Sequence, residues 1–126
     1  MMLSDVRTML HCDVFTGEEL LNRPVVLGCA SDLMSDVLAF SATGALLLTG
    51  LVTVQTVQTA HIAENNAIIF VRGKKPDGKV IALAKKMGLP LMGTPYSMYE
   101  ACGILYRAGL ESTMKCGQAA AAAGRP

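Results

Sequence analysis

Four short polar segments follow apolar runs in this 126-residue sequence, and each carries groups that can bind an anion. The candidate binding residues are Ser31, Asp32, Thr49, Gly50, Arg72, Gly73, Lys74, Thr94, Tyr96 and Ser97. Hydroxyls, cations and backbone amides at helix starts are the groups that hold a phosphate or a carboxylate. The sequence therefore predicts an anion-binding site. The competing interpretation is that these residues serve turns and helix caps, and that Asp32 repels an anion.

Residues 73–80 contain the phosphate-loop pattern G-x-x-x-x-G-K. The position after the lysine is Val80, where such a loop needs a hydroxyl for magnesium. Pro76 also removes a backbone N–H from the middle of the segment. We expect a basic turn and a helix that starts at Pro76-Asp77, and no nucleotide hydrolysis here.

The cysteines and histidines form no recognisable catalytic or metal-binding set. The four cysteines are Cys12, Cys29, Cys102 and Cys116, and no C-x-x-C pair is present. We expect them to be buried, reduced thiols, since metal sites usually use ligands paired at short spacing. His11 directly precedes Cys12, and neighbours in sequence rarely face one metal, whereas His61 falls on a predicted helix surface. The sequence predicts no enzymatic activity, no metal and no cofactor.

Apolar runs and amphipathic stretches alternate along the chain and must position these residues. We expect strands at residues 12–16, 25–29, 45–49, 67–71 and 89–93. We expect helices at residues 5–11, from Ser31 or Asp32 onward, and at 53–64, 77–87 and 97–108, with Gly88 and Gly109 ending the last two. Continuous aliphatic strands between amphipathic helices indicate a small three-layer, Rossmann-like α/β sandwich with a mainly parallel sheet. The polar segments would then meet at the carboxyl ends of the strands, where open α/β sheets bind ligands.

Two details of this assignment can be checked against a structure. Ser4 is expected to cap the first helix, and Leu33, Val37 and Phe40 to form the apolar stripe of the second. Residues 1–110 are expected to form a single domain. Residues 111–126, which contain five consecutive alanines, are expected to be a dispensable tail.

Charge and hydropathy exclude several classes of protein. Eleven Lys and Arg against ten Asp and Glu give a net charge of +1. The sequence therefore lacks the excess of basic residues that is typical of nucleic-acid-binding proteins. Residues 37–60 contain no charged residue, but their threonines and glutamines argue against a membrane span. The first residues lack the basic region and long apolar core of a signal peptide. We expect a cytoplasmic protein.

The small size and the 52% apolar content favour a homodimer formed through a helix face. Adaptable apolar side chains near predicted surfaces are Tyr96, Met98, Tyr99, Tyr106, Met34 and Met92. They either cover an interface or fill the core of one chain, and the sequence leaves both possibilities open.

Long strings at four places resemble the stand-alone DRTGG-domain proteins of bacteria and archaea. They are SDLMSDVLAF at residues 31–40, LLLTGL at 46–51, AIIFVRGK at 67–74 and TPYSMYEACG at 94–103. The resemblance extends over residues 3–110. It implies an α/β domain like the N-terminal domain of HPr kinase/phosphorylase, which is itself similar to the N-terminal domains of Mur ligases.

The resemblance also carries expectations about function. Similar domains accompany phosphotransacetylases and CBS domains, where a regulatory or ligand-sensing role is supposed. Stand-alone members are often labelled serine kinases, but kinase activity belongs to a separate C-terminal domain with a complete phosphate loop, so we do not expect it here. Some members are linked to iron-only hydrogenase systems and anaerobic metabolism, which implies a protein partner.

Three hypotheses follow from the sequence. The leading one is a non-catalytic regulatory module that senses a nucleotide or a phosphorylated metabolite and acts through a protein partner. The second is a structural accessory subunit of a redox complex, linked to iron-only hydrogenase. The third is a small phosphotransfer enzyme, which loss of a measurable turnover in an Arg72→Ala or Ser31→Ala variant would reveal.

Overall fold

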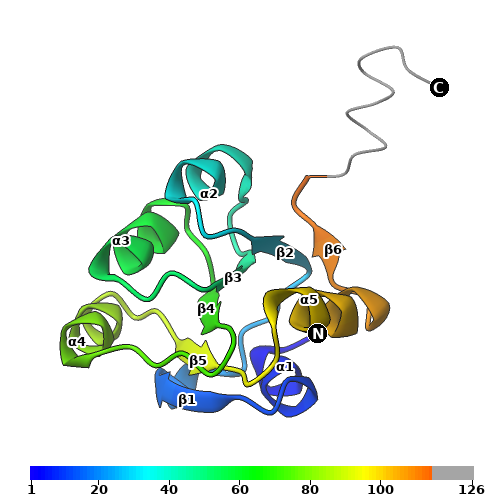
Figure 1. Ribbon diagram of the computed structural model, residues 1–126, viewed down its shortest axis with the longest axis horizontal. Coiled ribbons are helices and arrows are strands. Elements are labelled where there is room, and N and C mark those ends of the chain that lie inside the picture. Colours follow the sequence, from blue (N-terminus) through cyan, green and yellow to red (C-terminus); the bar gives the residue numbers. More distant parts are fainter. Residues whose placement is uncertain (115–126) are drawn as a thin grey trace.

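A computed structural model describes residues 1–114, which form a six-stranded sheet with helices on both faces (Figure 1). The strands are β1 (Asp13–Thr16), β2 (Leu27–Ala30), β3 (Leu46–Thr49), β4 (Ala67–Phe70), β5 (Leu91–Gly93) and β6 (Glu111–Ser112). Their spatial order is β1-β5-β4-β3-β2-β6. All neighbouring pairs are parallel except β1 and β5. This is the mainly parallel three-layer α/β sandwich that the alternating sequence predicts.

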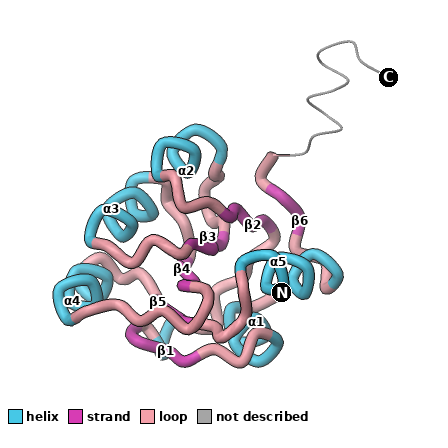
Figure 2. Tube along the Cα trace, in the orientation of Figure 1, coloured by secondary structure: helices cyan, strands magenta, loops and turns pink. Residues whose placement is uncertain are grey.

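The helices divide between the two faces of the sheet (Figures 1 and 2). They are α1 (Leu3–Met9), α2 (Met34–Phe40), α3 (Val54–Ile62), α4 (Gly78–Lys86) and α5 (Met98–Arg107), with a 3-10 turn, η1 (Glu18–Leu20). One face carries α2, α3 and α4, and the other carries α1 and α5. Thr53, Asp77 and Ser97, at which the sequence predicts three helices to start, are the N-cap residues of α3, α4 and α5, and they accept hydrogen bonds from the first turns.

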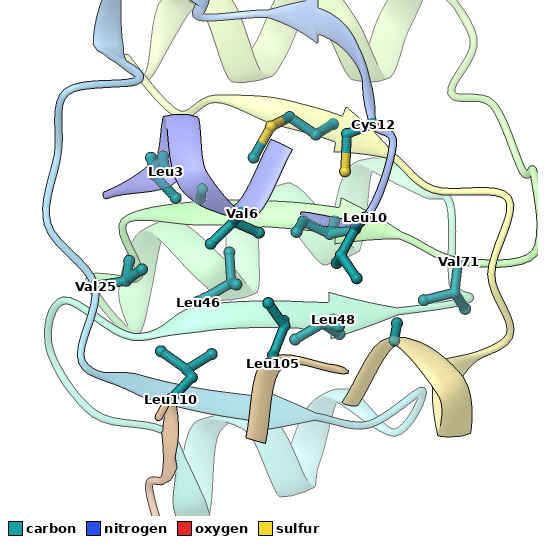
Figure 3. Packing of buried hydrophobic residues seen from close by; sticks show 14 of the residues in the cluster. Leu3, Val6, Leu10, Cys12, Val25, Leu46, Leu48, Val71, Leu105 and Leu110 are labelled. Carbon is teal, nitrogen blue, oxygen red and sulfur yellow. The ribbon is translucent and has the colours of Figure 1, made fainter. Parts of the chain in front are cut away.

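Two hydrophobic cores arise because side chains on one strand alternate between the two faces. Leu46 and Leu48 of β3 point into the core beneath α1 and α5, whereas Leu47 points into the core beneath α2, α3 and α4. Figure 3 shows the first core, where Leu46 and Leu48 lie among side chains of the two covering helices, including Val6 and Leu105. Burial on both faces explains why the central strands are continuously apolar in sequence.

The expected cap of the first helix is wrong. The helix begins at Leu3 with Met2 as its N-cap residue, so Ser4 lies inside the first turn. The carboxylate of Asp5 accepts the backbone N–H of Met2 at 2.8 Å, and this bond satisfies a free donor at the helix start. Met2 also forms an isolated bridge with Pro24, which fixes the entry of the chain into α1.

The expected start and apolar stripe of α2 are also wrong. The helix begins at Met34, after a turn in which the Ser31 hydroxyl accepts the N–H of Leu33 at 3.0 Å. Of the expected stripe Val37 is buried, whereas Leu33 and Phe40 are 59% and 47% exposed, and Met34 is buried in their place. Local sequence supports either start, and the turn at Ser31 decides between them.

The chain beyond Leu110 extends the sheet. Residues 111 and 112, which the sequence places in the tail, form β6 and pair with β2 in the register Leu27↔Glu111 and Gly28↔Ser112. The alanine-rich part of the expected tail lies outside the described residues. In residues 1–114 no helix has the length and apolar character that a membrane crossing requires. The uncharged stretch 37–60 is divided among the end of α2, β3 and most of α3.

Candidate functional site

The carboxyl ends of four parallel strands meet along one edge of the sheet, which we call the carboxyl rim. The register aligns Ala30 of β2 with Leu48 of β3, and Phe70 of β4 with both Thr49 of β3 and Gly93 of β5. The loops that follow these strands therefore leave the sheet at the same edge. They contain nine of the ten candidate residues, and the tenth, Thr49, ends β3.

Three of the loops meet at Gly50, just beyond β3. Asp32 Oδ1, from the loop after β2, accepts the N–H of Gly50 at 2.5 Å and the Thr49 hydroxyl at 3.1 Å. The Lys74 ammonium, from the loop after β4, donates to the Gly50 carbonyl at 2.7 Å. One glycine thus binds an anionic group through its N–H and a cationic group through its carbonyl.

Arg72 completes this group, which we call the rim cluster (Asp32, Gly50, Arg72 and Lys74). A Cβ placed on Gly50 would lie 2.9 Å from Arg72 Nη2 and 3.3 Å from both carboxylate oxygens of Asp32. The guanidinium and the carboxylate therefore flank the same glycine, and a side chain there would displace both. Arg72 is held in this place by a left-handed backbone (φ 61°) and by donation of its N–H to the carbonyl of Tyr96 at 2.8 Å.

The serine and threonine hydroxyls of the candidate residues already have partners in the fold. The Ser31 hydroxyl binds Leu33, and the Ser97 hydroxyl accepts the N–H of Glu100 at 3.2 Å as the cap of α5. Thr94 is fully buried, and its hydroxyl donates to the carbonyl of Leu10 at 2.7 Å. These hydroxyls stabilise turns and a helix cap, as the competing interpretation of the sequence expected. The charged side chains Asp32, Arg72 and Lys74 are exposed.

Backbone hydrogen bonds join the loop between β4 and α4 to the loop after β5. Gly73, in a left-handed conformation (φ 68°), donates its N–H to the carbonyl of Thr94 at 2.9 Å. Tyr96 is half-buried, and its ring centroid lies 6.0 Å from that of His11. Gly73, Thr94 and Tyr96 therefore position Arg72 relative to Gly50.

Residues 73–80, which imitate a phosphate loop, end in a helix cap. Asp77 Oδ1 accepts the N–H groups of Lys79 and Val80, both at 3.0 Å, so a side-chain carboxylate already binds these two amides. Asp77 starts the helix as the sequence predicts.

The thiols differ in environment. Burial raises the pKa of Cys12 to about 12, with a smaller contribution from the charge of Asp13. Burial also raises the pKa of Cys29 and of Cys102, and the nearby Cys29 is a smaller cause for Cys102. Cys116 lies outside the described residues. Within residues 1–114 no group of three or more His, Cys, Asp or Glu is placed to hold a metal ion.

A groove of about 1090 Å³, not anticipated from sequence, runs along α5 beside the edge formed by β2 and β6. Its walls include Gly28, Cys29 and Cys102, and it reaches the carboxyl rim at Ser97. The relevant sequence signal is the pair Tyr99 and Tyr106, which are 91% and 71% exposed. Of the side chains the sequence left undecided between core and surface, these two face solvent, whereas Met34 and Met92 fill the core.

No family model and no curated protein matches this chain. The fold is similar to that in the crystal structure of the CBS and DRTGG domains of the regulatory region of Clostridium perfringens pyrophosphatase, complexed with the activator diadenosine tetraphosphate. The TM-score is 0.70 at 18% sequence identity. The match covers 86% of this chain and 47% of that one, so this chain spans about half the length of the protein it resembles. At this identity the likeness establishes the fold.

Proposed function

We propose that this chain is a non-catalytic regulatory module that binds a nucleotide or a phosphorylated metabolite at the carboxyl rim. The observation that carries the proposal is the rim cluster, in which three loops bring a guanidinium, an ammonium and a carboxylate to one glycine. The fold likeness to a regulatory region crystallised with a nucleotide activator supports the same class of ligand.

The charges of the rim favour an anionic ligand. Arg72, Lys74 and Lys75 are exposed cations on one loop, and the carboxylate of Asp32 lies beside the same glycine, Gly50, as Arg72 and Lys74. Cations outnumber the carboxylate, so the rim attracts a phosphate group, which arginine binds through two parallel hydrogen bonds. The carboxylate of Asp32 accepts the N–H of Gly50. We propose that a ligand phosphate takes its place.

The placement of the ionisable groups supports a binding role without catalysis. His61 lies exposed on α3, and His11 lies after α1 on the opposite face of the sheet. The Ser31 hydroxyl is bonded within its own turn and has no neighbouring base among its recorded partners in residues 1–114. A nucleophile needs such a base or a lowered pKa to be activated.

Thermal shift with a panel of nucleotides, phosphorylated metabolites, pyrophosphate and inorganic phosphate tests the proposal. A ligand at 100 times its dissociation constant adds about 2.7 kcal/mol, which for a domain of this size is a rise in Tm of roughly 10 °C. Arg72→Ala should weaken binding about tenfold or more, because a charge-assisted hydrogen bond is lost.

The matched control is Lys86→Ala, which removes an exposed cation from the last turn of α4. Since the carboxyl end of α4 points away from the rim, this variant should bind as tightly as the parent chain. An absence of any shift across the panel, or equal losses in the two variants, would remove the basis for the proposal.

The α5 groove favours a second candidate, a structural accessory subunit of a redox complex. Two exposed tyrosines beside a groove of this size suit a protein surface better than a small anion. Copurification from the native host would test this role, and recovery of a hydrogenase-linked partner would support it. We also propose a homodimeric state and a cytoplasmic location, with neither nucleic acid nor membrane as a partner.

A further inference from the structure

The exposed face of α5 has a symmetric pattern of side chains. It carries Tyr99, Glu100, Gly103, Tyr106 and Arg107, all of which are exposed. Residues seven apart on an α-helix lie about 20° apart around its axis and about 10 Å apart along it. The two tyrosines therefore form one flank of the face, the two charges form the other, and Gly103 lies at the centre between them.

No contact and no backbone conformation within residues 1–114 requires a glycine at position 103. A glycine inside a helix costs about 1 kcal/mol relative to alanine. A Cβ added there would meet no atom within 4 Å, and Gly103 is absent from the residues with positive φ. Neither crowding nor backbone conformation within residues 1–114 requires a glycine. Close approach of a second backbone would require one.

We propose that two copies of this chain pair through α5, with the two helices antiparallel about a two-fold axis at Gly103. A two-fold axis reverses the order of residues along the second helix and keeps each flank on its own side. Tyr99 of one copy then lies opposite Tyr106 of the second, and Glu100 lies opposite Arg107 of the second. Each dimer thereby gains two tyrosine contacts and two ion pairs.

Within residues 1–114, Glu100 and Arg107 form no ion pair. Glu100 and Arg107 are separated by about 10 Å along the helix axis, beyond the range of an ion pair. The ion pair recorded within residues 1–114 is Arg7 with Glu18, at 3.2 Å. The self-complementary order of charge, glycine and tyrosine favours a second copy over an unrelated partner, since an unrelated partner needs no such symmetry.

The groove has the size that this arrangement requires. A ten-residue helix about 10 Å across and about 15 Å long occupies roughly 1200 Å³, and the groove beside α5 measures about 1090 Å³. Its second wall, formed by Gly28 and Ala30 of β2 and by β6, flanks the incoming helix. The groove borders the exposed face of α5, because the five residues of that face are among its lining residues, together with the buried Leu48 and Leu105. The groove reaches the carboxyl rim at Ser97, but none of the four rim-cluster residues lines it. Sedimentation therefore tests the pairing, and thermal shift tests the proposed ligand.

Charge exchange with sedimentation velocity over a concentration series tests the pairing. The parent chain should be a dimer. Glu100→Arg and Arg107→Glu should each raise the dimer dissociation constant about tenfold or more, because each replaces two attractive contacts by two like-charge contacts. The double variant Glu100→Arg/Arg107→Glu should restore the parent value. Restoration identifies a contact between copies, since the two residues do not meet within one chain.

Two further variants separate pairing from folding. Gly103→Gln should raise the Tm of the monomer, because glutamine favours helix, and abolish the dimer, because its side chain keeps the helices apart. Lys86→Glu, a charge reversal on α4, should leave the dimer unchanged. A parent chain that is monomeric throughout, a double variant without restoration, or a dimeric Gly103→Gln would each overturn the proposal.

Discussion

Cys12 shows how burial changes the chemistry of one residue. It lies at 8% exposure in the core beneath α1 and α5. Burial, with a smaller contribution from the charge of Asp13, raises the pKa of its thiol to about 12. Because the thiolate is the reactive form, Cys12 is a small apolar core residue at neutral pH, although it follows His11 in sequence.

This raised pKa predicts a loss of stability in alkaline solution. The unfolded thiol ionises near pH 9 and the folded one near pH 12, so the folded chain binds the extra proton between these values. Stability from this group is complete below pH 9 and falls as the pH rises, by on the order of 1 kcal/mol at pH 10. Urea unfolding at pH 8 and pH 10 should show the loss, and Cys12→Ala should reduce it. An equal loss in the variant would assign the effect to other groups.

At the scale of elements, α4 shows how one carboxylate converts a phosphate-loop pattern into a helix cap. Asp77 binds the two amides that such a loop would direct at a phosphate. The same side chain starts a helix whose Val80 and Ala84 pack beneath the sheet. The amides at this strand end therefore contribute to stability, and the charged side chains of the preceding loop remain for recognition.

The cap at Asp77 predicts an asymmetric pair of variants. Asp77→Ala should lower the free energy of unfolding by about 1 kcal/mol, because two helix amides lose their acceptor. Asp77→Asn should retain most of the stability, since asparagine caps helices about as well as aspartate. Urea unfolding of both variants measures the difference. An equal loss in both would mean that the charge of Asp77, and not its hydrogen bonds, stabilises α4.

At the scale of the whole molecule, the rim cluster exists because the sheet aligns loops that are distant in sequence. Asp32 is 18 residues from Gly50, and Lys74 is 24 residues from it. The carboxylate holds the place that we assign to a ligand phosphate, so Asp32 and the ligand would compete for the N–H of Gly50.

This competition predicts opposite effects of one variant on stability and on binding. Asp32→Asn should lower the Tm of the free chain, because a charge-assisted hydrogen bond becomes a neutral one. The same change should tighten binding of whichever phosphorylated compound gives the largest thermal shift, because a competing charge is removed. Calorimetric titration measures the affinity, and Asp36→Asn on α2 is the matched control. Weaker binding by Asp32→Asn would show that the carboxylate contacts the ligand instead of yielding to it.

Local sequence was sufficient to predict most of the helices and strands, but it was less informative about the contacts at the carboxyl rim. The aliphatic runs at β3 and β4 and the caps at Thr53 and Ser97 depend on neighbours within a few residues, so they could be predicted. The start of α2 could not, since Ser31 and Asp32 are both acceptable caps. In the structure Asp32 binds the N–H of Gly50. This contact depends on the pairing of β2 with β3, which local sequence does not reveal.

The sequence by itself determined the alternation of strands and helices, the parallel sheet and the edge where the four loops meet, because periodicity and turn residues act over short distances. Only the tertiary structure decided which side chains at that edge are already bonded. It also decided that Tyr99 and Tyr106 face solvent while Met34 and Met92 fill the core. Those outcomes depend on which surfaces meet after the chain has closed, and residues far apart in sequence supply them.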